Sequence, residues 1–361
     1  MEMMTDMYCP NLDMKSDKLI ETLVKNSEVD VFELEPGAPP LFIVANSRKL
    51  QKPGALASWL CQNRSVVDAL LLVHGGVVFR EFSVSDTSEF NAVVKQFEPF
   101  SGNYQGGGAP RSKIEGQVYE ATQLAGHLKI MLHQEMAYIE KPPQRIIFFC
   151  HKPAEMGGET VIADMRQITR GLPASLREKL ERLGVLYVRN FGPPELGLNK
   201  RAEEHPDQRS WGAAFYSQDK DEVDKVCRAK GFDPVWLDNG GLRLRSRMPG
   251  FKAHRVTGEH IYRAVLHNDG GREMMTSALP EKKRRQVEKM LARQEFRTGC
   301  YLGDGSEITK DEMETLNSLF RNAERSWKWQ PKDIMLLDNL LTAHGRNPFE
   351  GTRDIQVALL D

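Results

Sequence analysis

The sequence predicts a mixed α+β, mainly β fold: a double-stranded β-helix (jelly roll) core with flanking helices and a long helix-rich insertion. Two observations predict it. Short apolar runs with strand character lie near both ends of the chain, whereas helical spacing dominates the middle. No linker or internal repeat divides the 361 residues. We therefore expect one domain over 1–361, with about 1–15 flexible and about 165–325 inserted between core strands.

The first part of the chain predicts strands and helices in turn. Strands are expected where apolar and β-branched residues run together, at 42–44, 75–79, 130–133 and 145–150. Helices are expected at 53–70 and 87–97.

The middle and the end follow a different pattern. Helical spacing predicts helices at 173–183, 219–230, 279–293 and about 309–324. Thr309 and Glu312 form the T-x-x-E pattern of a capping box, which marks the start of the last of these helices. Two strands are expected beyond them, at 333–337 and 355–360.

Composition excludes several classes of protein. The chain has 49 basic and 50 acidic residues, so no overall field attracts it to nucleic acid or anionic lipid. Residues 1–10 lack the basic and apolar regions of a secretory signal, and the most apolar stretch, 69–79, is too short to span a bilayer. The five cysteines are dispersed without C-x-x-C spacing, which argues against a disulfide scaffold or a structural zinc site. We expect a reduced, cytoplasmic setting.

His133, Glu135 and His344 are candidate metal ligands. On a strand, residues two apart share one face, so His133 and Glu135 can reach the same ion. Two imidazoles and one carboxylate can occupy one face of Fe(II) and leave three positions open. Taken alone, H-x-E is a common chance match, and a lone histidine near the end of a chain is usually a surface or core residue.

Arg353 and Thr160 are candidates for holding an anion near these ligands. Arg353 leads into an otherwise apolar strand, and a buried guanidinium needs an anionic partner. A dicarboxylate co-substrate could supply it through a bidentate pair, with a salt bridge to Asp354 or Glu350 as the structural alternative. Thr160 offers a hydroxyl just after a Gly-Gly-Glu turn.

Three ordered motifs give the chain a specific resemblance. Residues 148–164 resemble the F-F-C-x-x-P-A-x-x-G-G-E-T-x-I-A-D stretch of the taurine dioxygenase-like family of Fe(II)/2-oxoglutarate oxygenases. Residues 133–138 are similar to the H-x-E-M-x-Y of its SyrP-like branch, the tailoring hydroxylases of peptide and amino-acid natural products. Residues 329–346 resemble the terminal block of the same branch. The similarity covers about 70–361.

The resemblance implies both a site and a reaction. His133, Glu135 and His344 match the family's iron ligands, and Thr160 and Arg353 match the residues that hold the distal carboxylate of 2-oxoglutarate. The implied cofactors are Fe(II), 2-oxoglutarate as co-substrate and O2, with decarboxylation to succinate coupled to oxidation of a C–H bond. Related halogenases replace the carboxylate ligand with a small residue, so Glu135 disfavours halogenation and leaves hydroxylation, desaturation or ring formation.

Three further residues are candidate substrate contacts. The family usually has Asn or Gln in the strand that follows Thr257-Gly258-Glu259, whereas this chain has Arg263 there, which either binds an anionic substrate group or points outward into solvent. Arg111 follows a Gly-rich stretch that we interpret as a mobile flap near the active site, and Gln123 precedes His133 by ten residues.

We therefore predict an Fe(II)/2-oxoglutarate oxygenase that acts on an amino acid, a peptide or a carrier-tethered intermediate in natural-product biosynthesis. The alternatives are a catabolic dioxygenase of a small sulfonate or carboxylate, and a jelly-roll protein that binds metal without turnover. No nucleic-acid or membrane partner is expected. The oligomeric state, a homo-oligomer included, stays open.

Overall fold

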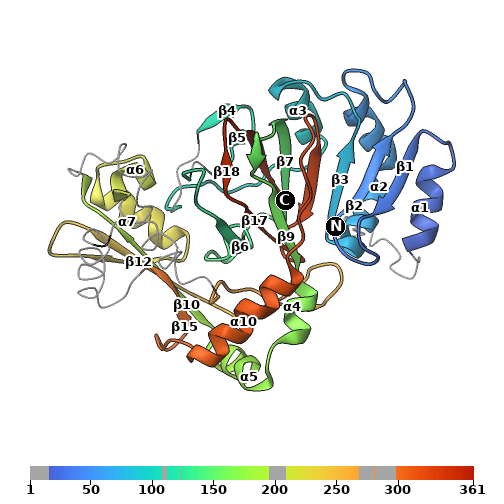
Figure 1. The fold of residues 1–361 in the computed structure, drawn as a ribbon. Coiled ribbons are helices and arrows are strands. Elements are labelled where there is room, and N and C mark those ends of the chain that lie inside the picture. Colours follow the sequence, from blue (N-terminus) through green and yellow to red (C-terminus); the bar gives the residue numbers. More distant parts are fainter. Residues whose placement is uncertain (1–15, 108–111, 123, 195–208, 268–280, 282–297) are drawn as a thin grey trace, which may run out of the picture.

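A computed structural model describes residues 16–107, 112–122, 124–194, 209–267, 281 and 298–361. Within these ranges the protein has a mixed α+β architecture built on several sheets (Figure 1). The start of the chain, 1–15, and the expected helix at 279–293 lie outside the described residues, apart from residue 281.

The largest sheet has eight strands in the order β1-β2-β3-β16-β7-β19-β5-β4. Their bounds are β1 Val29–Glu33, β2 Leu41–Ala45, β3 Gly76–Arg80, β4 Lys113–Glu115, β5 Val118–Glu120, β7 Arg145–Lys152, β16 Ile334–Asp338 and β19 Asp354–Leu360. Helix α2 (Ala55–His74) connects β2 to β3, which run parallel. The other paired strands of this sheet are antiparallel.

Both faces of this sheet are buried, and alternate residues of each central strand serve different faces. Ile147 and Phe149 pack into the core shared with α2 and α3 (Thr87–Val94), whereas Phe148 packs into a second core on the other face. Burial on both sides explains why these strands are continuous apolar runs rather than alternating ones. In Figure 1 the helices α1 (Ser16–Val24) and α2 cover the outer side of the sheet.

A three-stranded sheet lies on the inner side, in the order β6-β17-β9. Its strands are β6 Ile130–His133, β17 Thr342–Arg346 and β9 Thr160–Asp164. A short pair, β8 Met156–Gly157 and β18 Phe349–Glu350, continues it at one end. Ile162 of β9 belongs to the same core as Phe148 of the large sheet.

The insertion holds strands as well as helices. It holds a four-stranded antiparallel sheet, β11-β12-β10-β15, and a hairpin, β13-β14. The strands are β10 Val185–Phe191, β11 Asp233–Trp236, β12 Leu242–Met248, β13 Phe251–Ala253, β14 His260–Tyr262 and β15 Gly299–Leu302. Strand β12 alternates leucine with arginine from 242 to 245, a period-two signal of a strand with one apolar face.

The expected helices within the described ranges are present as α2, α3, α5 Ala174–Leu183, α7 Lys220–Ala229 and α10 Lys310–Ala323. Two further helices, α4 Met165–Gly171 and α6 Trp211–Phe215, were not predicted. The capping box of α10 forms as expected between Thr309 and Glu312. Helix α2 runs four residues beyond the predicted end, to His74, and stops at Gly75 in the left-handed region. No helix among the described residues has both the length and the apolar character needed to cross a bilayer.

Candidate functional site

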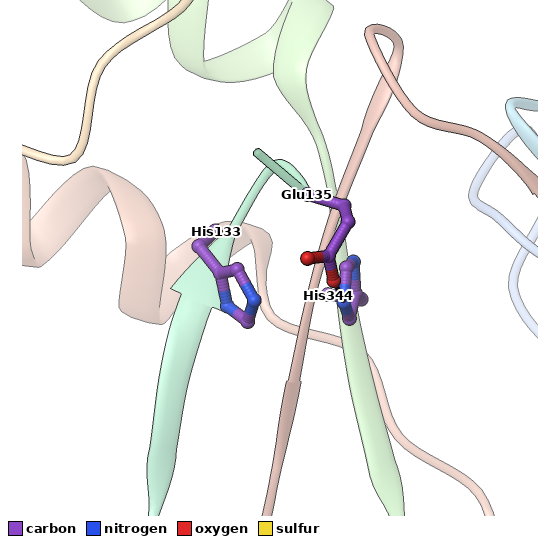
Figure 2. Close-up of side chains that lie close together, drawn as sticks. All are labelled: His133, Glu135 and His344. Carbon is purple, nitrogen blue, oxygen red and sulfur yellow. Dashed lines mark ion pairs between the residues drawn. The ribbon is translucent and has the colours of Figure 1, made fainter. Parts of the chain in front are cut away.

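The structure brings the three predicted metal ligands together. His133 ends β6 and His344 lies on β17, and the two residues are directly paired in register. Their ring centroids are 4.5 Å apart, and Figure 2 shows both rings and the Glu135 carboxylate turned toward one another. One donor atom from each of the three side chains lies within 4.8 Å of the other two. The histidines thus come from neighbouring strands that are remote in sequence.

Glu135 reaches the site for a reason that differs from the predicted one. Strand β6 ends at His133, so Glu135 is not a strand neighbour on the same face but part of the following turn. Met136 continues this turn with a φ of 55°, in the left-handed region. The Gln134 side chain turns away and donates to the carbonyl of Leu340 at 2.7 Å. The three side chains do come together, but the turn rather than strand alternation positions the carboxylate.

The chemistry of this donor set fits a divalent iron ion. His133 Nδ1 lies 2.8 Å from the carbonyl of Met131, so Nδ1 carries the proton and Nε2 is the donor for a metal. His344 Nε2 lies 3.7 Å from Glu135 Oε2, too far for a hydrogen bond. Two donors on one ion at about 2.1 Å each lie at most about 4.2 Å apart, so this separation suits a shared metal. Both side chains are less than 10 % exposed.

Thr160 lies on the same face of the three-stranded sheet as His344. Residues directly opposite in an antiparallel pair project to one face, and Thr160 pairs with Arg346 just as Ile162 pairs with His344. Two residues along a strand correspond to about 7 Å. The Thr160 hydroxyl is buried and accepts a hydrogen bond from Trp329 Nε1 at 3.2 Å. A hydroxyl therefore lies one step along the sheet from the metal ligands.

Arg353 approaches the same end of the sheet from the residue before β19. Its Nε donates to the carbonyl of Gly158 at 2.9 Å. Gly158 has a φ of 73°, and a Cβ there would come within 3.2 Å of Arg353 Cδ, which explains the glycine. In the described part of the chain no carboxylate lies within 4.0 Å of this guanidinium, and Asp354 pairs instead with His151 at 2.6 Å. The alternative of a salt bridge to Asp354 or Glu350 is therefore wrong.

Arg346 is a second arginine at this end, and sequence reasoning missed its role. It is 4 % exposed, and its guanidinium donates to the carbonyls of Leu124, Ala125 and Leu128 at 2.9 to 3.0 Å. Burial lowers the pKa of Arg346 to about 10. Burial and the neighbouring Arg346 also lower the pKa of Arg353 to about 10. The position of Arg346 two residues after His344, on the same strand face, is the sequence signal that could have identified it.

The weaker substrate candidates have mixed outcomes. Arg111 and Gln123 lie outside the described residues. Arg263 is 3 % exposed, and its Nη2 donates to the carbonyl of Ile139, so the alternative of an outward, solvated arginine was wrong. Burial lowers its pKa. In this position Arg263 holds the turn that follows Glu135.

The described part of the Gly-rich stretch lies against the insertion, beside the same turn. Arg209 donates to the carbonyl of Gly107 at 2.8 Å, and Lys230 donates to that of Gln105 at 2.9 Å. Arg189 donates to the carbonyl of Gly106, and its guanidinium carbon lies 3.9 Å from the centre of the Tyr138 ring. Sequence reasoning did not identify these three cations, because they are remote from the loop in sequence.

Comparisons with known proteins agree with this geometry. Residues 35–359 match the model of the family described as taurine catabolism dioxygenase TauD, TfdA family. The chain is 28 % identical over 295 residues to the dapdiamide synthesis protein DdaC of Enterobacter agglomerans, covering 82 % of this chain and 84 % of that protein. It is also 28 % identical over 299 residues to a clavaminate synthase-like protein of Arabidopsis thaliana, covering 81 % and 83 %.

The fold is also similar to a solved structure. The PvcB protein from Pseudomonas aeruginosa superposes with a TM-score of 0.51 at 15 % identity, over 92 % of this chain and 91 % of that one. At this identity the likeness concerns the fold alone. The family match extends over nearly the whole chain and includes all three candidate ligands. The chain therefore belongs to the TauD/TfdA family of Fe(II)- and 2-oxoglutarate-dependent dioxygenases.

Proposed function

We propose that His133, Glu135 and His344 hold the iron of this dioxygenase, and that Thr160 and Arg353 hold the distal carboxylate of 2-oxoglutarate. The observation that carries the proposal is the shared sheet face, with two imidazoles at one end and a buried hydroxyl at the other. Arg353 adds a desolvated cation with no carboxylate within 4.0 Å among the described residues. An anion bound there would offset the cost of burying that charge.

Each part of the site has a separate task. Iron held by His133, Glu135 and His344 would, with 2-oxoglutarate and O2, supply the oxidant for a C–H bond of the substrate. Arg353 uses only Nε for the protein, so both of its Nη groups can form a bidentate pair with a carboxylate. The ring of Phe148 lies 5.3 Å from that of His344 and covers the ligand on its apolar side. The remaining open side is where we expect the target C–H bond to be held.

The two sheets explain how one site collects residues from three segments. We propose that the three-stranded sheet and the large sheet are the two halves of a double-stranded β-helix, within one domain that spans the chain. Consecutive strands cross between the halves: β16 lies in one and β17 in the other, and β7 and β9 are divided in the same way. Core residues of both sheets pack together.

We further propose that the substrate is an amino acid, a peptide or a carrier-tethered intermediate of natural-product biosynthesis. The support is the similarity to DdaC, whose name describes a dapdiamide synthesis protein. Glu135 retains the carboxylate ligand, which favours hydroxylation, desaturation or ring formation over halogenation.

The test is substrate-triggered turnover. Purified protein is incubated with Fe(II), ascorbate, O2 and 2-oxoglutarate and a panel of amino acids and peptides, and succinate is measured. We expect a subset of the panel to stimulate succinate formation, with a product that gains one oxygen or loses two hydrogens by mass. Stimulation by small sulfonates or simple carboxylates alone would instead favour the catabolic role that the family description names.

A further inference from the structure

Asn339 joins the two segments that supply metal ligands. It lies in the turn between β16 and β17 and is 3 % exposed. Its Oδ1 accepts a hydrogen bond from the backbone N–H of Glu135 at 2.7 Å. Its Nδ2 donates to the carbonyl of Glu135 at 3.0 Å and to that of Pro143 at 2.8 Å. One amide thus holds both sides of the Glu135 backbone from the turn that leads into the strand of His344.

Asp338 in turn fixes the backbone on which Asn339 stands. It is 6 % exposed, and its Oδ1 accepts from the N–H groups of Leu340 and Leu341, each at 2.9 Å. Its Oδ2 lies 3.0 Å from Nε2 of His254, which is 5 % exposed and follows strand β13 of the insertion. The carboxylate therefore ties the turn to the insertion.

The tautomer of His254 follows from its other contacts. Its Nδ1 accepts from the backbone N–H groups of Val256 at 3.3 Å and Thr257 at 3.1 Å. The proton must then lie on Nε2, which donates it to Asp338. His254 is therefore the donor to Asp338, and Asp338 is joined through the backbone to Asn339, which contacts the Glu135 peptide.

We propose that Asn339 is a positioning residue for the carboxylate ligand, and that the His254–Asp338 pair holds Asn339 in place. The inference rests on the proposed iron site. Because Glu135 lies in a turn with a left-handed residue after it, its strand does not determine where the carboxylate points. The backbone clamp supplies this constraint. Groups that orient metal ligands in this way typically contribute about 10- to 100-fold to metal affinity.

The amide is required because it donates on one side and accepts on the other. In Asn339→Asp the shape is unchanged, but the donor becomes a second acceptor that faces the carbonyls of Glu135 and Pro143. The turn must then shift or the acid must bind a proton. Asn91→Asp is the matched control, since Asn91 is also buried, at 6 % exposed, but lies on α3 and away from the ligands.

The experiment is a Mn(II) titration followed by electron paramagnetic resonance, without 2-oxoglutarate or substrate, on the full-length protein. We expect Asn339→Asp to weaken Mn(II) binding by about 10- to 100-fold, and Asn91→Asp to bind like the wild type. His254→Phe, which keeps Asn339 and removes the Nε2 donor, should weaken it by a smaller factor. The Co(II) absorption spectrum should change for Asn339→Asp and not for Asn91→Asp, because only the former alters the ligand geometry.

The inclusion of His344→Ala separates this inference from the proposed function. If His344→Ala binds Mn(II) as well as the wild type, the proposed iron site is wrong. If His344→Ala loses the metal while Asn339→Asp retains it with unchanged affinity and spectrum, the site holds and the clamp is overturned. If Asn339→Asp does not fold, Asn339→Ser takes its place, and wild-type affinity in both Asn339→Ser and His254→Phe overturns the clamp.

Discussion

The two ends of one strand face carry opposite chemistry. On one part of this face, His344 in the middle of β17 meets His133 and Glu135, and together they offer lone pairs and a negative charge to a cation. Two residues further on, Arg346 lies opposite Thr160 with Arg353 nearby, and this end offers donors and positive charge to an anion. A ligand with a chelating end and a carboxylate end can bind across this face in only one orientation. If the proposed site is right, this contrast would set the direction in which a 2-oxo dicarboxylate binds.

The two arginines of the anion end also differ from each other. Arg346 uses both of its Nη groups for three backbone carbonyls. Arg353 donates to the protein only through Nε, which leaves its Nη groups for the proposed ligand. Arg346 is thus a structural residue that adds positive charge, whereas Arg353 is the proposed anchor.

Glu135→Ala should have the largest effect. Removing one of three protein donors from the ion should abolish detectable Fe(II)-dependent turnover and metal binding, because two imidazoles alone hold the ion weakly. The measurement is succinate formation together with Mn(II) titration. Glu140→Ala removes an exposed carboxylate from the same turn and should be silent. Turnover of Glu135→Ala near the wild-type rate would show that Glu135 is not a metal ligand needed for the reaction.

Arg353→Ala should act on co-substrate binding rather than on metal. Truncating one partner of a buried charge-assisted pair costs roughly 2–5 kcal/mol, which corresponds to about a 30- to 4000-fold rise in the KM for 2-oxoglutarate. Mn(II) affinity in the absence of 2-oxoglutarate should stay unchanged. Lys152→Ala, which removes an exposed cation from the strand next to β19, is the control. An unchanged KM would mean that another residue holds the distal carboxylate.

Arg346→Met should distinguish the structural arginine from the anchor. One buried and two partly buried carbonyls lose their donors, so the free energy of unfolding should fall by roughly 2–4 kcal/mol, measured by chemical denaturation. The KM for 2-oxoglutarate should rise much less than in Arg353→Ala, because the ligand contact is retained. A larger rise in KM for Arg346→Met than for Arg353→Ala would exchange the two roles.

Thr160→Val should have a smaller effect at the same end. The isosteric change removes one hydroxyl, and a typical hydrogen bond contributes about 0.5–1.5 kcal/mol, so the KM for 2-oxoglutarate should rise by about 2- to 10-fold. Thr342→Val on the neighbouring strand also removes a buried hydroxyl, one that donates to the carbonyl of Gly75, and serves as the control. Equal KM changes in both variants would show that loss of packing, not loss of a ligand contact, is measured.

A histidine far from the site, His74, offers a control: changing it should alter stability but not co-substrate binding. His74 is buried between Ser16 and Glu33, and burial is the main cause that lowers its pKa from the usual value. As the pH falls, His74 is therefore protonated in the unfolded chain at a higher pH than in the folded protein. The free energy of unfolding should fall as the pH drops below about 6.5, by at most about 1.4 kcal/mol per pH unit from this residue.

The variant His74→Phe should flatten this pH dependence and leave the KM for 2-oxoglutarate at neutral pH unchanged. His260→Gln, at an exposed histidine on β14, should keep the wild-type slope. Chemical denaturation at several pH values measures the pH dependence of the free energy of unfolding in both variants. A shift in KM for His74→Phe would mean that the outer helical layer influences the site, which the separation of the two cores argues against.

Much of the site was predictable because its chemistry leaves a local signature. An H-x-E pair, a distant histidine and an arginine before an apolar strand can be recognised in order along the chain, and the structure brings the three ligands together. Most of the central strands were predictable from their apolar runs. The sheet of the insertion was not predicted, because the leucine–arginine alternation of β12 is short and the arginines mask its apolar face. The cations Arg189 and Lys230 contact a loop remote in sequence, and no local pattern announces such contacts.

The sequence by itself determined which groups are available: two imidazoles, a carboxylate, a hydroxyl and a guanidinium in a fixed order. Only the tertiary structure decided how they face one another. Strand register places Thr160 and Arg346 on the face of His344, and register depends on pairing between segments far apart in the chain. The orientation of Glu135 depends on an asparagine that follows it by about two hundred positions in sequence and lies within hydrogen-bond distance in space. A hydrogen bond needs only proximity, and proximity is a property of the folded chain.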